Sequence, residues 1–229
     1  MFGPFALTPS STQLERLKED RVTMAAVVPR MRHYIWADGR GALAQGLVDV
    51  DVGAGCFEGV EIEIEFGPDY PRVPPRFFDL ARRWKPDQDR HLMANHEFCL
   101  WLAHVDAPDL ARSEALGELL LRLIAFLRDQ FVFDDLKRWP GPDWRHGDRA
   151  AYAQHVRETL HITDVESLRR LWPLVLGLSC NTSTRCPCGS GLTYGRCHRA
   201  GVESLRWLAS TPVRTHVPGA VEGQLRNAG

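Results

Sequence analysis

The chain has 229 residues, of which 44% are hydrophobic and 25% are charged, and its formal net charge is −1. This composition is typical of a folded, soluble protein and excludes a disordered chain. The near-neutral charge argues against a nucleic-acid or anionic-membrane surface spread over the whole chain. No apolar run approaches the roughly 20 residues of a membrane-spanning helix, and residues 1–13 lack the pattern of a signal peptide. We therefore expect a cytoplasmic protein without a membrane partner, whose cysteines are thiols or metal ligands rather than disulfides.

The first segments predict one helix and two strands. Residues 10–12, Ser-Ser-Thr, can cap a helix that runs to about Val28, because charged and apolar residues follow them and a proline comes next. Residues 33–36 and 44–52 have strand character and are punctuated by glycines.

Strict alternation makes residues 59–66 the clearest strand. Four apolar side chains alternate with three glutamates, which is typical of a strand with one buried and one solvated face. The apolar members are Val60, Ile62, Ile64 and Phe66. The prolines within residues 70–75 cannot continue a ladder, so a stiff crossing leads to the next strand, residues 76–80. We expect three or four antiparallel strands, with Cys56 as an inert packing residue beside a turn.

Cys99 is the candidate nucleophile. It follows the non-periodic residues 84–95 and lies at the edge of an apolar segment, where a cysteine can be partly exposed. The alternative is a buried structural thiol. His91 and His96 lie close in the sequence and could deprotonate an incoming amine or orient the loop, although each is also a common loop or packing residue. The chain has no Gly-rich nucleotide fingerprint, so ATP would be handled elsewhere.

Helices dominate the rest of the chain. Ser113 can cap a helix whose apolar residues recur at a spacing of three or four. Those residues are Leu116, Leu119, Leu120, Leu123, Ile124 and Leu127. Residues 147–160 and 164–176 are further helix candidates, the second broken or ended near Pro173. The order helix, strands, helices predicts an α+β fold. Residues 211–229 lack periodicity and should form a flexible end.

A Cys/His motif near the C-terminus has the spacing of a metal site. Cys186 and Cys188 lie one residue apart, and Cys197 and His198 follow after eight more, so the four side chains can surround one structural zinc ion. The alternative is a reduced cysteine cluster without metal. Six arginines against two glutamates occur from residue 185 onward. This region could contact nucleic acid or an acidic protein, and a solvated positive tail fits the same pattern.

Residues 57–102 resemble the core of the ubiquitin-conjugating enzyme (UBC) superfamily. The resemblance rests on Phe57-x-Gly59, on Tyr-Pro-Arg-Val-Pro-Pro at 70–75, and on His91 before Cys99-Leu100. It extends over residues 10–160. The pattern is most similar to bacterial members, with Cys-Leu-Trp at 99–101 and Trp-Pro-Gly-Pro…His-Gly within 139–147.

The resemblance implies a UBC-like antiparallel sheet flanked by helices, in which Cys99 carries a thioester. Cys99 would accept the C-terminus of a ubiquitin-like modifier or of another protein from an activating enzyme and pass it to an amine or other nucleophile on a protein acceptor. Eukaryotic members have an asparagine six residues before the cysteine, where this chain has Met93. The oxyanion donor could therefore be Asn95, His91, His96 or a backbone N–H. Stand-alone bacterial relatives resemble components of antiphage operons.

The Cys-Pro-Cys-Gly-Ser-Gly string at 186–191 resembles the SEC-C motif, with Leu192 in place of the usual lysine. We expect four regions: a UBC-like conjugating domain at 1–162, a helix and junction at 163–183, a SEC-C zinc module at 184–200 and a basic, partly flexible tail at 201–229. The alternative to an enzyme is an inactive UBC-fold module that binds or recruits partners through the zinc motif.

Overall fold

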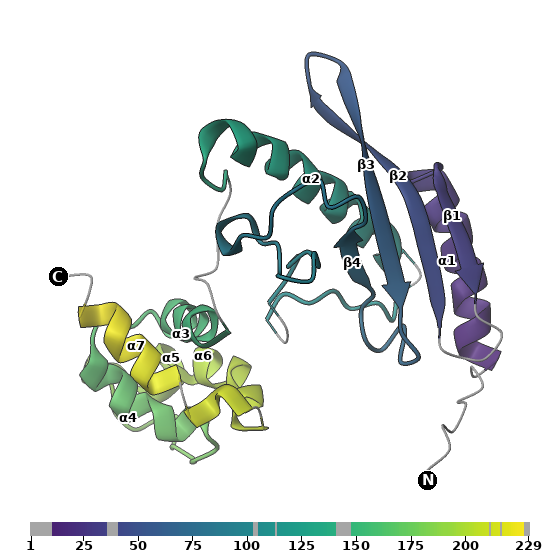
Figure 1. The fold of residues 1–229 in the computed structure, drawn as a ribbon. Coiled ribbons are helices and arrows are strands. Elements are labelled where there is room, and N and C mark those ends of the chain that lie inside the picture. The colour runs from purple at the N-terminus through teal and green to yellow at the C-terminus, as the bar shows by residue number, and fades with distance from the viewer. Residues whose placement is uncertain are drawn as a thin grey trace, which may run out of the picture. The chain divides into compact units, whose positions relative to one another are not determined.

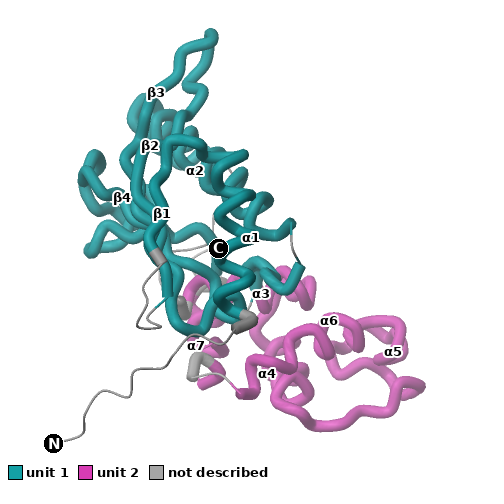
Figure 2. The backbone as a smooth tube through the Cα atoms, turned by 90° about the vertical axis from the view of Figure 1, so that its right-hand side faces the viewer, with its two compact units in different colours: residues 1–143 teal, residues 144–229 magenta. Residues whose placement is uncertain are grey.

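A computed structural model describes residues 11–35, 41–102, 105–112, 114–140, 148–210, 212–215 and 217–226. The chain forms two compact units, residues 1–143 (unit 1) and 144–229 (unit 2), which Figure 2 colours separately. The predicted first domain extends to residue 162. The structure divides earlier because the helix at Asp148–Thr159 packs against the C-terminal helix at Val217–Arg226.

Unit 1 contains a four-stranded antiparallel sheet in the order β1-β2-β3-β4, with one helix before it and a long helix after it (Figure 1). Its elements are α1 (Ser11–Val27), β1 (Met31–Ile35), β2 (Ala42–Gly53), β3 (Cys56–Phe66), β4 (Arg76–Asp79), the 3-10 turn η1 (Gln88–Arg90) and α2 (Ala115–Leu136). The predicted α+β class with an antiparallel sheet is confirmed. Trp36, expected in the first strand, lies outside the described residues.

β2 and β3 form the longest pair of the sheet, from Ala42 opposite Phe66 to Gly53 opposite Cys56. The alternation from Val60 to Phe66 divides the faces of β3 as predicted: the four apolar side chains of this stretch are buried and the glutamates between them remain accessible. The hairpin turns through Ala54 and Gly55, whose φ angles of 53° and 75° suit a tight two-residue turn. The sheet therefore has one face committed to the core.

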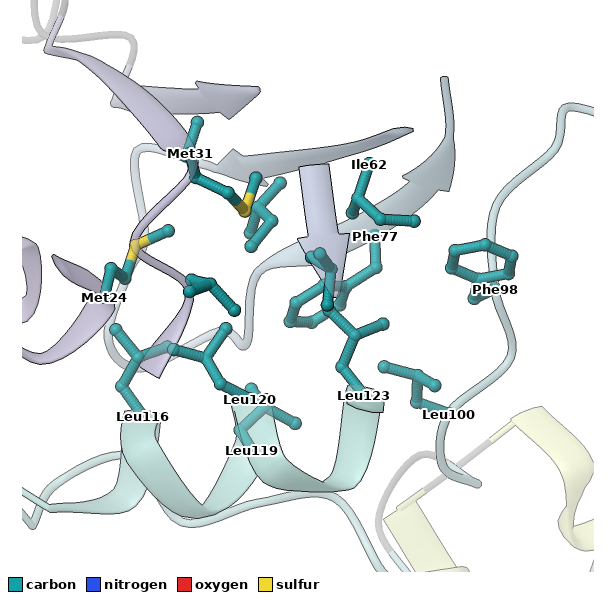
Figure 3. Packing of buried hydrophobic residues seen from close by; sticks show 14 of the residues in the cluster. Met24, Met31, Ile62, Phe77, Phe98, Leu100, Leu116, Leu119, Leu120 and Leu123 are labelled. Carbon is teal, nitrogen blue, oxygen red and sulfur yellow. The ribbon is translucent and has the colours of Figure 1, made fainter. Parts of the chain in front are cut away.

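α1 and α2 pack against each other, α1 also against β1 and α2 also against β2. Figure 3 shows side chains of α2, among them Leu116, Leu120 and Leu123, directed toward the buried residues Ile62 and Phe77 of the sheet. The predicted leucine stripe is thus the buried face of α2. The predicted cap Ser113 lies outside the described residues, and the N-cap position belongs to Glu114.

The crossing at residues 70–75 is fastened to α1. The buried Tyr70 hydroxyl donates a hydrogen bond to Asp20, whose carboxylate also accepts bonds from Arg16 Nε at 2.9 and 3.0 Å. Burial raises the pKa of Asp20 in spite of these bonds from Tyr70 and Arg16. Gln13 Nε2 donates to the carbonyl of Pro68 at 2.9 Å. These contacts hold the path of the chain as it enters β4.

In its described residues, unit 2 consists of helices joined by turns and irregular segments, with an isolated bridge between Arg185 and Thr193. Its elements are α3 (Asp148–Thr159), α4 (Val165–Val175), α5 (Tyr194–Cys197), α6 (Arg199–Ser204), the 3-10 turns η2 (Arg206–Ser210) and η3 (Pro212–Thr215), and α7 (Val217–Arg226). Asp164 caps α4 by accepting a bond from Ser167 N at 2.7 Å. Pro173 lies inside α4, which ends at Val175 as expected. In the described ranges of both units, no helix has the length and apolar character needed to cross a membrane.

The prediction that residues 211–229 lack regular structure is wrong for α7. Val217 and Val221, one helical turn apart, are fully buried, and the helix packs against α3 and α4. One proline and two glycines among the ten residues of α7 disfavour a helix, so its apolar residues give too weak a helical signal in the sequence. Tertiary packing therefore decides this helix.

Candidate functional site

Cys99 lies in an extended segment whose side chains alternate between the core and solvent. Phe98 and Leu100 are 4% and 7% exposed, whereas Cys99 between them is exposed. Successive side chains of an extended chain point to opposite faces, so the burial of the two apolar neighbours turns the thiol outward. The sulfur lies 3.8 Å from the carbonyl oxygen of Trp101.

Backbone hydrogen bonds attach this segment to the edge of the sheet and to the preceding loop. Phe98 N donates to the Phe77 carbonyl of β4 at 2.8 Å, and Asp79 N donates to the His96 carbonyl at 3.0 Å. On the other side, Cys99 N donates to the His91 carbonyl at 2.8 Å. These hydrogen bonds fix the position of the Cys99 backbone and thereby the side from which the thiol is accessible.

The loop before Cys99 is joined to α2 through a buried arginine. Arg90, 7% exposed, pairs with Asp134 and has its guanidinium 4.7 Å from the ring centre of Phe133. Asp134 also accepts a bond from Trp84 Nε1 at 2.9 Å, and Gln130 Nε2 donates to the Arg90 carbonyl at 2.6 Å. Burial acts to raise the pKa of Asp134, but the bonds from Arg90 and Trp84 outweigh it and lower the pKa.

His91 and Asn95, the residues predicted to act with Cys99, make different contacts. His91 contacts Cys99 through its backbone carbonyl and occupies the left-handed region with φ of 54°. Its ring meets Trp139 edge-on, with centres 4.7 Å apart. Asn95 is exposed, and its side chain exchanges hydrogen bonds with Glu97 at 3.1 and 3.2 Å. The described contacts of the Asn95 side chain therefore stabilise the turn before Cys99.

His96 and Cys56 were also singled out in the sequence. His96 has a φ of 64°, and its buried Nδ1 has no hydrogen-bond partner among the described residues. Cys56 is exposed at the β2–β3 hairpin, so the expectation of a packing residue is wrong. The tip of this hairpin lies beyond the last buried pair, Val48 and Val60, and has no core to enter.

Arg76 and Glu97 were not predicted for this site. Arg76 Nε and Nη2 bind the two carboxylate oxygens of Glu97 at 3.0 and 2.5 Å, and Arg76 Nη1 lies 3.3 Å from Glu65. The arginine follows the paired prolines directly, but no local pattern connects it with a glutamate 21 residues later. Only the pairing of the two segments brings them together.

Unit 2 gathers the four predicted metal ligands. Ligand atoms of Cys186, Cys188, Cys197 and His198 all lie within 4.8 Å of one another. The sulfurs of Cys188 and Cys197 are 3.7 Å apart, and His198 Nδ1 lies 3.3 Å from the Cys186 sulfur. Two sulfurs that each lie about 2.3 Å from a tetrahedral zinc ion are separated by about 3.8 Å. The cluster is therefore compatible with zinc.

The surroundings of the cluster fit this assignment. His198 Nε2 lies 2.7 Å from the Leu160 carbonyl, so a proton on Nε2 leaves Nδ1 as the ligand atom. Ser190 N donates to the Cys188 sulfur at 3.4 Å. Burial raises the pKa of the Cys186 thiol, so a bound cation would be needed to stabilise the thiolate there. Zinc here would be structural, because four protein ligands leave no position for water.

Tight backbone turns shape residues 184–200, called the metal loop here, and α6 at its end packs against the end of α3. Gly189 and Gly191 have φ angles of 87° and 80°, and Cys186 N donates to the Leu192 carbonyl at 2.7 Å. A Cβ at Gly201 would lie 2.8 Å from the carbonyl oxygen of Thr159, which ends α3. The loop is therefore part of unit 2 and not a separate appendage.

Comparison with known families supports the metal motif. A family model of the SEC-C motif matches residues 183–200, the loop that carries all four ligands. Among curated proteins, none matches the chain.

Proposed function

We propose that the chain is a ubiquitin-conjugating-like cysteine acyltransferase that forms a thioester on Cys99. The observation that carries this proposal is the exposed thiol between two buried neighbours, on a segment bonded to the sheet on one side and to a loop on the other. A helix, a four-stranded antiparallel sheet and then the cysteine is also the order that the UBC resemblance implies.

The chemistry needs two steps. The Cys99 sulfur attacks the carbonyl of a thioester delivered by an activating enzyme, a new C–S bond forms, and the carrier leaves as a thiol with the proton that Cys99 loses. An amine of a protein acceptor then attacks the same carbonyl and releases the Cys99 thiol. Both steps suit sulfur, because exchange between thioesters is nearly balanced in energy and a thioester remains reactive toward amines.

The test uses the full chain with candidate activating enzyme, ATP and a ubiquitin-like modifier. The expected product is an adduct that thiols remove, absent in Cys99→Ala and replaced by a thiol-resistant oxyester in Cys99→Ser. Cys56→Ser is the matched control, since it removes another exposed cysteine. Loading that persists in Cys99→Ala, or that is lost in Cys56→Ser, rejects the assignment.

A second candidate function, recruitment of an anionic partner, is favoured by the charge of unit 2. Residues 144–229 hold eleven arginines, no lysine and six acidic residues, a formal charge of +5, against −6 for residues 1–143. No acidic residue occurs between Glu166 and Glu203. This asymmetry gives unit 2 a positive field although the whole chain is close to neutral.

Six of the eleven arginines of unit 2 form two contrasting groups among the described residues. Three of them form ion pairs: Arg169 with Glu222, Arg170 with Glu166 and Arg199 with Glu203. Three exposed arginines on or beside the metal loop have no carboxylate partner among the described side chains: Arg185, Arg196 and Arg206. Unpaired arginines are the ones available to a phosphate or carboxylate ligand.

These two groups supply a matched test. We expect replacement of the three unpaired arginines by glutamine to weaken binding of a labelled DNA duplex or an acidic peptide more than replacement of the three paired ones. Both triple variants lose the same charge. For a duplex, each lost phosphate contact should reduce the slope of log K against log salt by about 0.9. Equal losses in both variants would mean that net charge alone attracts the probe.

A further inference from the structure

The segment that carries Cys99 continues the edge of the sheet beside β4. Phe78 and Glu97 form an antiparallel bridge. Hydrogen bonds flank the bridge on both sides, from Asp79 N to the His96 carbonyl and from Phe98 N to the Phe77 carbonyl. In an antiparallel pair, each step forward on one strand matches a step back on the other. Two steps from the bridge, Arg76 therefore lies opposite Cys99.

Arg76 and Cys99 also share a face of this sheet edge. Phe77 and Phe98 are buried, so their chain neighbours point to the opposite, outer face. Arg76 and Cys99 are both exposed, in agreement with this alternation. Directly opposite residues on one face have Cβ atoms about 4.5–5.5 Å apart, so the side chains of Arg76 and Cys99 start from neighbouring positions on this face.

The arginine side chain is held on this face by three neighbours. Glu97 binds it through both oxygens, Glu65 opposite it on β3 lies 3.3 Å away, and its guanidinium stacks 4.9 Å from the ring centre of Phe78. The bond from Glu97 raises the pKa of Arg76. Burial acts to raise the pKa of Glu97, but the bonds from Arg76 and Asn95 outweigh it and lower the pKa. Both groups are thus charged at neutral pH.

We propose that Arg76 is the electrostatic partner of Cys99, a cation fixed by Glu65 and Glu97 that stabilises the thiolate. Among the described residues, the charged and titratable groups on or beside this part of the sheet edge include Arg76 from β4, Glu65 from β3, Glu97 from the segment of Cys99 and His91 from the preceding loop. Arg76 favours the thiolate, and the two carboxylates oppose it. The proposal deepens the role given to Cys99 and rests on that role, but the reactivity of the thiol can be measured without activating enzyme or modifier.

The experiment measures alkylation of Cys99 by iodoacetamide as a function of pH, with peptide mass spectrometry to separate Cys99 from the other cysteines. Arg76→Gln should raise the pKa of the Cys99 thiol and slow alkylation at pH 7 about threefold, the effect of one charge about 6 Å away in a water-like medium. Arg76→Lys should keep most of the wild-type rate. Glu97→Gln should have the opposite effect and lower the pKa. High salt should reduce all these shifts, because the groups are exposed.

The opposite signs distinguish electrostatics from a purely structural role. Loss of the Arg76–Glu97 pair would loosen the segment in both variants and change the rate in the same direction, which would overturn the proposal. Arg72→Gln is the matched control: this arginine is exposed and paired with Asp69 on the crossing, and its loss should leave the Cys99 rate unchanged. An unchanged pKa in folded Arg76→Gln would also overturn the proposal. Opposite shifts support it even if the chain forms no thioester, a result that would reject only the proposed function.

Discussion

Cys99 of unit 1 and Cys186 of unit 2 show two ways in which this chain places a cysteine. Cys99 is exposed because Phe98 and Leu100 enter the core on either side of it. Cys186 is buried, and its sulfur lies among three other ligand atoms. A thiol that reacts with other proteins must be accessible, whereas a thiolate that holds a structural ion must be enclosed.

The supports of the two sites differ in the same way. The Cys99 segment depends on an apolar core and on backbone bonds to β4, and none of these requires a ligand. The metal loop has few buried apolar side chains of its own, Cys186 and Tyr194 among residues 184–200. Unit 1 should therefore keep its structure without metal, while the metal loop should not.

Removal of zinc should produce the largest effect. Cys188→Ser should reduce bound zinc from one ion per chain to none, because structural zinc sites contribute on the order of 10–16 kcal/mol to folding. Residues 184–200 should then become sensitive to protease. The end of α3 should also loosen, because His198 bonds to Leu160 and α6 packs on Thr159 through Gly201. Cys99 alkylation should persist.

Cys180→Ser is the control for this experiment, because Cys180 lies near the loop but outside the ligand cluster. Its zinc content, measured by atomic absorption, should match the wild type. A metal-free Cys188→Ser chain that resists protease as well as the wild type would contradict a structural metal. If the rate of Cys99 alkylation fell in proportion to the zinc content, the Cys99 segment would depend on the metal, and the two sites would not be independent.

Truncation of a core anchor should have the next largest effect. Phe98→Ala should lower the free energy of unfolding of unit 1 by about 3–5 kcal/mol, because it leaves a cavity beneath the Cys99 segment. Phe57→Ala is the matched comparison, since Phe57 is 67% exposed on the hairpin, and should change stability by no more than about 0.5 kcal/mol. Urea denaturation measures both values. Similar costs would show that burial does not hold the segment.

Loss of the Asp134 carboxylate should cost less and should depend on pH. Asp134→Asn leaves the buried Arg90 without its ionic partner, for an expected loss of about 1.5 kcal/mol at neutral pH, the lower end for a bond to a charged group because Asp134 is partly exposed. The folded-state pKa of Asp134 is lowered, so its contribution is complete above the unfolded value of about 3.9. It should disappear as the pH falls through the lowered folded value.

Stability measured from pH 7 down to pH 3 tests this dependence. The gap between wild type and Asp134→Asn should narrow in acid. Asp135→Asn removes a neighbouring exposed carboxylate on the same helix and should leave stability close to wild type at every pH. A constant difference in stability between the two proteins across this range would mean that Asp134→Asn destabilises the fold for reasons other than the lost charge.

Replacement of Pro74 and Pro75 by alanine should have the smallest effect. Each proline stabilises the fold by about 0.4–1 kcal/mol, because it reduces the freedom of the unfolded chain. The double variant should melt a few degrees lower and keep the wild-type rate of Cys99 alkylation per folded molecule. A stable double variant with an unreactive Cys99 would instead assign the crossing a direct role at the site.

Elements whose signal is local can be predicted from the amino-acid sequence alone. The alternation from Val60 to Phe66 defined a strand and its buried face, and the leucine spacing defined α2. The spacing of the Cys and His residues defined the metal cluster, because ligands that are close in sequence can meet around one ion in few ways. In each case the physical cause, a repeat or a short loop, lies within a few residues.

Features that depend on contacts between distant segments are visible only in the folded chain. The division of the chain at residue 143 and the helix α7 follow from packing among helices of unit 2. The placement of Arg76 opposite Cys99 follows from a bridge between residues 78 and 97, and burial of Phe77 and Phe98 fixes its register. A shift of one residue in that register would bury the thiol. This register depends on the packing of the whole core, so it cannot be predicted from the sequence of either segment.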